Sequence, residues 1–199
     1  INLVTPTHYA PSIAVALNEL RDSGSLNIPV VYNTSSFDSL EALRLMKGAV
    51  DVYLADFKYA SALEAGKLSH TSRYPEIALA AIEEMVAQVP VWEEDDEGLL
   101  LKGVIVRHLV LPGRVEESKR ALAVLHERFG DNVRLSIMSQ YTPLASGLER
   151  YGLAGRVTEE EYEEVLDYAD SLGIEDYFWQ QGDAAQESFV PDFNGEGVR

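Results

Sequence analysis

Short apolar runs alternate along this chain with longer segments in which apolar residues return every three or four positions. The short runs are rich in β-branched and aromatic residues, which is typical of strands. They cover residues 1–4, 28–32, 50–55, 103–111, 133–139 and 177–180. Because one helical segment lies between most of them, and βαβ connections are right-handed, the pattern predicts an α/β fold with about six parallel strands and outer helices.

The intervening segments carry the signals with which helices begin and end. Asp38 with Glu41, and Thr158 with Glu161, have the spacing of an N-terminal capping box. Prolines suit the first turn of a helix, and glycines suit the position after its last residue. The expected helices start near Pro11, run from Asp38 to Gly48, cover 60–69, start at Pro75, run from Val115 to Phe129, and run from Thr158 to Gly173.

The parallel sheet is expected to curl into a TIM-type barrel rather than to stay open. An open dinucleotide-binding sheet has a glycine-rich turn after its first strand, whereas this chain has TPTHYAP there. In a barrel, polar residues gather where the strands end, because the loops at that edge build the site. Such residues do follow the predicted strands, and we expect one domain over 1–193 with a flexible tail over 194–199.

Strand alternation predicts which of these residues face the barrel interior. Side chains two apart share a face, so Asp56 and Lys58 lie on one surface. Either Arg107 or His108 points inward, and a guanidinium against the outer helices would be desolvated without a partner. We therefore place Arg107 inside and give His108 a hydrogen bond in the core. Met138 and Gln140, which share a face, are expected to point inward as well.

Charge and composition exclude several partners. The chain has 16 Lys and Arg against 33 Asp and Glu, a formal net charge of −17, which disfavours nucleic acid and anionic membranes. It has no apolar stretch of bilayer length and no signal-peptide pattern at its start. It also contains no cysteine, so it offers neither disulfides nor thiolate metal ligands. We expect a cytoplasmic protein.

The polar residues at the strand ends suit a zwitterionic ligand that carries hydroxyl groups. Arg107 or Lys58 would bind a carboxylate, and Asp56 would bind an ammonium group. Further candidate residues follow the first two strands, at Thr7, His8, Asn33, Thr34 and Ser35. The Asn and Ser groups among them would bind ribose-like hydroxyls. An amino-acid nucleoside fits this set of groups. The alternative is that Asp56 and Lys58 simply pair with each other.

Six stretches in order resemble the carboxyl-terminal part of radical S-adenosylmethionine proteins, in the branch related to pyruvate formate-lyase activating enzyme. They are INLVTPTH, PVVYNTSSF, VDVYLADFKY, GVIVRHLVLPG, SIMSQYTP and RVTEEEYEEVLDYADSLG. The resemblance implies a partial barrel of β/α units. It also implies reductive cleavage of S-adenosylmethionine by a [4Fe-4S] cluster, and hydrogen abstraction from a glycine of a partner enzyme.

The resemblance carries over to individual residues. The Asp-Thr-Asn-Gly-Phe turn of the activating enzymes corresponds to 33–37, where Thr34 and Phe37 match. Their Asp-Leu-Lys element corresponds to 56–58, with both ionic groups kept. Arg107 stands where the family has an arginine near the ligand. Met138 and Gln140 fall near a later strand that in the family often carries Pro-Tyr-His, of which the histidine is missing here.

The cysteine loop of the family, Cys-x3-Cys-x2-Cys, precedes the segment that matches Ile1, and this chain has no cysteine. Three thiolates are needed to hold the cluster. We therefore expect a piece of a longer protein, which binds S-adenosylmethionine but is inactive alone. The strands that it lacks would expose a barrel edge through which it could self-associate.

Two other classes of function stay open from the residues alone. One is a self-sufficient barrel enzyme: either an aldolase that forms a Schiff base at Lys58, or a hydrolase with a metal on His8, Asp56 and His108. The other is a noncatalytic module that docks a partner protein through the exposed barrel edge.

Overall fold

The computed structural model describes residues 1–144 and 146–180, so the expected tail over 194–199 lies outside the described residues. Six strands form one parallel sheet in the order β1-β2-β3-β5-β6-β7. They are β1 (Asn2–Val4), β2 (Val31–Thr34), β3 (Val52–Asp56), β5 (Leu100–Leu109), β6 (Arg134–Met138) and β7 (Tyr177–Trp179). The described strands do not close into a cylinder, and the predicted partial TIM-type barrel is confirmed.

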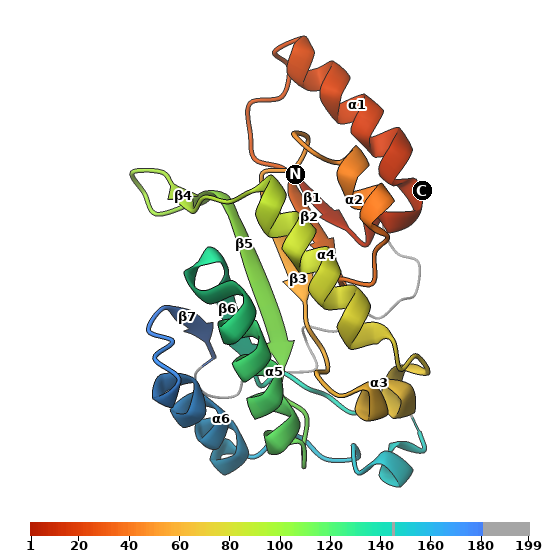
Figure 1. The fold of residues 1–199 in the computed structure, drawn as a ribbon, viewed down its shortest axis with the longest axis vertical. Helices are drawn as coiled ribbons and strands as arrows, with labels where there is room; N and C mark the ends of the chain where they lie inside the picture. Colours follow the sequence, from red (N-terminus) through yellow and green to blue (C-terminus); the bar gives the residue numbers. More distant parts are fainter. Residues whose placement is uncertain (145, 181–199) are drawn as a thin grey trace.

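The helices lie on one side of this sheet (Figure 1). They are α1 (Ala10–Asp22), α2 (Leu40–Leu45), α3 (Ala62–Ser69), α4 (Tyr74–Gln88), α5 (Val115–Phe129) and α6 (Glu159–Ser171). Short 3₁₀ turns add η1 (Pro6–Tyr9), η2 (Gly130–Asn132) and η3 (Leu148–Tyr151). All helices lie on the same side because right-handed βαβ crossovers connect strands whose order in the sheet follows the sequence.

Alternate strand residues therefore meet two different environments. Tyr32, Tyr53, Val106 and Ile137 are buried under the helices. The residues between them remain partly accessible on the opposite side, which we call the open face. Its central members are Asn33, Leu54, Asp56, Ile105, Arg107, Leu109, Ser136 and Met138. The polar interior that the strand pattern predicts is this open face.

The amino end of the open face is filled by an aromatic side chain. A short strand, β4 (Glu93–Glu94), forms an antiparallel hairpin with β5. It brings Trp92 over Gly103, where a Cβ atom would lie 2.7 Å from the indole Cε3. Arg134 stacks on the same indole, with Cζ 5.3 Å from the ring centroid. Because this end is occupied, the accessible part of the open face lies toward the carboxyl ends of the strands.

Two local expectations need correction. The strand expected over 28–32 begins only at Val31, because Pro29 has no amide hydrogen for pairing. The amide of Val31 donates to the carbonyl of Ile1 at 2.8 Å. Asp38 does not cap α2. The Oγ of Ser39 does so, accepting from the amide of Ala42 at 3.1 Å. The helix over 115–129 and the capping box at Thr158 are confirmed.

Candidate functional site

An ion pair joins the carboxyl ends of β3 and β5 on the open face. Asp56 and Arg107 stand opposite each other in the register of the two strands. The Arg107 Nε atom donates to Asp56 Oδ1 at 2.8 Å, and Nη2 lies 2.6 Å from the same oxygen. The Nη2 group also donates to Asn33 Oδ1 on β2 at 2.8 Å. Three adjacent strands thus contribute one polar group each to a single cluster.

This cluster keeps binding capacity for a ligand. Among the described residues, neither Asp56 Oδ2 nor Arg107 Nη1 has a hydrogen-bond partner. Both side chains are 23% exposed, so these atoms face accessible space. A carboxylate oxygen and a guanidinium NH₂ are strong partners for an ammonium and a carboxylate group, respectively. Asp56 therefore pairs with Arg107 and not with Lys58, and the alternative of an Asp56–Lys58 pair is wrong.

A buried tyrosine holds the backbone that follows Asp56. The Tyr74 hydroxyl accepts from the amide of Lys58 at 3.0 Å. It lies within donating distance of the carbonyls of Asp56, at 2.9 Å, and Ser35, at 3.0 Å. Burial raises the pKa of this phenol, so it stays protonated and able to donate. Sequence reasoning missed Tyr74, because a tyrosine before the helix-starting Pro75 carries no motif.

A cavity of about 570 Å³ opens beside the ion pair. It lies at the carboxyl ends of β3, β5 and β6, and its volume is in the range of small-molecule sites, roughly 300–1,000 Å³. Five of the candidate residues line it, namely Asp56, Lys58, Arg107, Met138 and Gln140. The structure thus brings half of the candidate residues to one cavity.

The other five candidates do not line this cavity. Asn33 reaches the site through Arg107, as described above. The backbone carbonyl of Ser35 accepts a hydrogen bond from the Tyr74 hydroxyl. His8 is exposed on η1. Thr34 is buried on the helix-covered side, where it and Thr7 donate to the carboxylate of Asp38. These two hydroxyl groups hold the turn after β2 together instead of facing the open face.

His108 lies in the core, as expected. Nδ1 is 2.8 Å from the carbonyl of Phe57 and Nε2 is 2.9 Å from Ser118 Oγ. Because a carbonyl can only accept, Nδ1 carries the proton and Nε2 accepts from the serine. The metal site on His8, Asp56 and His108 is therefore wrong. No cluster of three potential metal-binding side chains occurs in the described part of the chain.

The buried His108 predicts a pH-dependent stability. Burial lowers its pKa below the ordinary value of 6.5, so below pH 6.5 the unfolded chain binds a proton that the folded chain does not. Its contribution to the free energy of unfolding is full above pH 6.5 and falls by up to about 1.4 kcal/mol per pH unit below it. Urea unfolding at pH 7.5 and 5.5 should show a smaller pH effect in His108→Gln. The exposed His70→Gln variant serves as the control, and an equal effect in both variants would contradict the prediction.

Several cavity-lining residues come from loops that sequence reasoning passed over. Tyr59 follows β3, His70 ends α3, and Tyr141, Arg150 and Tyr151 lie between β6 and α6. Tyr59 and Tyr141 stand in the resembling stretches VDVYLADFKY and SIMSQYTP, and the others belong neither to a strand end nor to a motif with characteristic spacing. Their position over the cavity is a result of how the loops pack, and no signal in the sequence indicates it.

No protein-family model matches the chain. The chain is 30% identical over 170 residues to the uncharacterized protein MJ0674 of Methanocaldococcus jannaschii. The match covers 85% of this chain and 45% of that protein, so this chain spans less than half of its relative's length. None of the helices in 1–144 and 146–180 is long and apolar enough to cross a bilayer.

Among solved structures, the chain is similar to a domain of pyruvate-formate lyase-activating enzyme from Bacteroides vulgatus. The TM-score is 0.65 at 12% identity, over 91% of this chain and 98% of that domain. A radical SAM methyltransferase from Sphaerobacter thermophilus aligns at a TM-score of 0.48 and 14% identity, over 77% of this chain and 41% of that protein. The first likeness shows the fold: this chain has the fold of the activating-enzyme domain.

Proposed function

We propose that this chain forms the S-adenosylmethionine-binding part of a radical S-adenosylmethionine protein. The observation that carries the proposal is the cavity at the carboxyl edge of the open face, which gathers Asp56, Lys58 and Arg107. The sequence resemblance to the activating-enzyme branch and the fold shared with a domain of such an enzyme support it. The finer proposal, that the whole protein activates a glycyl-radical enzyme, rests on the resemblance.

The groups that are free at the ion pair match the charged end of S-adenosylmethionine. Arg107 Nη1 would bind the carboxylate, and Asp56 Oδ2 would accept from the amino group. Apolar atoms of Leu109 and Met138 line the same cavity and offer contact to the sugar and the base. Gln140 also lines the cavity, and its amide oxygen accepts from Gln180 Nε2 at 3.0 Å.

The residues of this chain do not fit a [4Fe-4S] cluster. The chain has no cysteine, and its described part has no cluster of three metal-binding side chains. Thiolates hold such clusters. We therefore assign to this chain the binding of S-adenosylmethionine and no step of its cleavage, and we place the cluster of the full-length protein on residues outside this sequence.

The Schiff-base aldolase has less support. A nucleophilic lysine is activated by an apolar environment or by a neighbouring cation, whereas the Lys58 side chain is exposed. Docking of a partner protein at the barrel edge stays a prediction, as does self-association through that edge.

Ligand binding to the 199-residue chain tests the proposal. We expect saturation-transfer NMR to show S-adenosylmethionine binding with a Kd at or below about 1 mM, which corresponds to roughly −4 kcal/mol. Adenosine and methionine, which each carry part of the recognised groups, should bind more weakly. Absence of saturation transfer at millimolar S-adenosylmethionine would overturn the proposed function.

A further inference from the structure

The cavity has the opposite charge balance to the rest of the chain. The whole sequence has 33 acidic against 16 basic residues. The cavity, in contrast, is lined by Lys58, Arg107, Arg150 and His70, and Asp56 is the one carboxylate among the described residues that line it. Because Asp56 is neutralised by Arg107 at 2.6 Å, Lys58 and Arg150 leave a positive field in the cavity. A surplus of cations in an acidic protein attracts an anion to this place.

These two cations come from segments outside the strands, whereas the ion pair stands on β3 and β5. Lys58 follows β3, and its ammonium group has no partner among the residues that the structure describes. Arg150 belongs to η3, and its Cζ lies 4.7 Å from the ring centroid of Tyr151. Stacking on a ring holds the planar guanidinium in one orientation while its N–H groups stay available.

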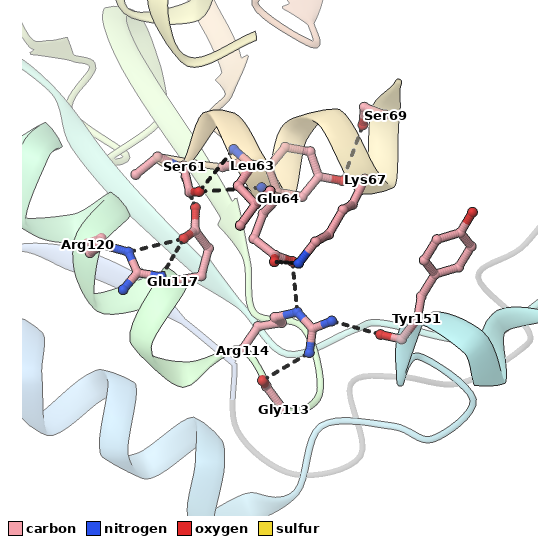
Figure 2. Close-up of polar contacts among 12 residues, drawn as sticks. Ser61, Leu63, Glu64, Lys67, Ser69, Gly113, Arg114, Glu117, Arg120 and Tyr151 are labelled. Atoms are coloured by element: carbon pink, nitrogen blue, oxygen red, sulfur yellow. Dashed lines mark hydrogen bonds and ion pairs between the residues drawn. The ribbon is translucent and has the colours of Figure 1, made fainter. Parts of the chain in front are cut away.

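The wall that carries Arg150 is fastened to α3 by a second arginine, Arg114 (Figure 2). Arg114 Nη2 donates to the Tyr151 carbonyl at 2.7 Å, and Nε donates to Glu64 Oε2 at 2.9 Å. Glu64 is in turn paired with Lys67 at 3.1 Å. The η3 turn is therefore held against α3 before any ligand arrives, and such preorganisation lowers the cost of binding.

The remaining lining on this side is apolar and aromatic. It consists of Tyr59, Leu68, Tyr141, Leu148, Tyr151 and Leu153. A site with apolar walls and a few placed cations selects a ligand with an apolar body and one anionic group. On the sheet side the charge of Arg107 is already balanced by the Asp56 carboxylate, so a ligand with a single anionic group favours the loop side of the cavity.

We propose that Lys58, His70 and Arg150 form an outer subsite that binds the carboxylate or phosphate group of an apolar substrate. Its role as a substrate site rests on the proposed function, because the bound molecule would then lie beside S-adenosylmethionine. The binding of the anion itself needs only this chain.

Phenyl phosphate, benzoate and neutral benzyl alcohol are suitable probes, since they share a ring and differ in charge. We expect saturation-transfer NMR to show that both anions bind at least tenfold more tightly than the alcohol. A preference between phenyl phosphate and benzoate identifies which oxyanion the subsite takes. Equal binding of all three probes would overturn the subsite.

Two substitutions that each remove one arginine test whether Arg150 is responsible for anion binding. Arg150→Gln should weaken binding of the anionic probes about fivefold to tenfold and leave the Kd of S-adenosylmethionine unchanged. Arg128 pairs with Glu83 on the exposed side of α5. Arg128→Gln removes the same charge, and it should change neither the binding of the anionic probes nor the Kd of S-adenosylmethionine. Equal effects of the two substitutions on the anionic probes would overturn the assignment.

Binding of the anions and binding of S-adenosylmethionine are measured separately, so the subsite and the proposed function can fail independently. If the anions bind and S-adenosylmethionine does not, the subsite stands and its role as a substrate site beside that ligand is overturned. If S-adenosylmethionine binds and the anions do not, only the subsite is overturned. Simultaneous binding of an anionic probe and S-adenosylmethionine supports the inference. Competition between the two ligands would contradict the claim that they occupy separate sides of the cavity.

Discussion

Replacing Arg107 by methionine is expected to raise the Kd for S-adenosylmethionine at least tenfold. The substitution keeps an unbranched side chain of similar reach and removes the guanidinium that pairs with Asp56 and Asn33. A charge-assisted hydrogen bond contributes about 1.5–3 kcal/mol, and about 1.4 kcal/mol already changes Kd tenfold. In addition, the Asp56 carboxylate would lose the partner that orients it toward the ligand's amino group. Titration of each variant by NMR or calorimetry measures the effect.

Arg134→Met is the matched control for this prediction. Arg134 lies on the same face of the sheet but at the start of β6, where it stacks on Trp92 and pairs with Asp176. Its loss should leave S-adenosylmethionine binding unchanged. Asp56→Asn should weaken binding through the amino group, and a cycle with Arg107→Met should show coupling between the two positions. If Arg107→Met binds the ligand as Arg134→Met does, the ion pair is not part of the binding site.

Replacing Glu117 by alanine is expected to lower the free energy of unfolding by about 2–3 kcal/mol. The carboxylate of Glu117 is 5% exposed and accepts from the amides of Ala60 and Ser61 at 2.8 and 2.7 Å. It also pairs with Arg120 at 2.8 Å (Figure 2). Each buried amide that loses its acceptor costs about 1–3 kcal/mol, and these amides are only partly buried. Urea unfolding followed by circular dichroism measures the loss.

Glu116→Ala provides the comparison, since the neighbouring Glu116 side chain is 74% exposed and pairs with Lys119 at the surface. Exposed pairs contribute little, so we expect a change below about 0.5 kcal/mol. Glu117→Gln keeps one acceptor oxygen and should fall between the two alanine variants. Equal stabilities of Glu117→Ala and Glu116→Ala would show that the carboxylate does not hold the segment after Lys58.

Periodicity and capping signals predicted most of the elements because they act over a few residues. The boundaries of α5 and the capping box of α6 are those that the sequence predicts. Asp38 shows where such reasoning fails. A carboxylate near a helix start looks like a cap, yet Asp38 accepts from Thr7, Tyr32 and Thr34. Those donors come from η1 and β2, and the spacing of residues around Asp38 does not indicate them.

The candidate site likewise contains some features that the sequence predicts and others that it does not. Strand alternation places Asp56, Arg107 and Met138 on one face, and the register of β3, β5 and β6 confirms this placement. The alternation of a strand is a property of its backbone, so it can be read without the fold. Lys58, which follows the end of β3, was predicted on the same grounds and does line the cavity.

The sequence by itself determined the order of β/α units, the side to which each strand residue points, and the acidic charge of the chain, since all three depend on local periodicity or composition. Only the tertiary structure decided that Asp56 pairs with Arg107 and that Tyr74 holds the backbone beside them. It also decided that Arg114 fastens η3 to α3, so that Arg150 lines the cavity. These contacts join residues that are distant along the chain, and their geometry depends on how helices and loops pack against the sheet.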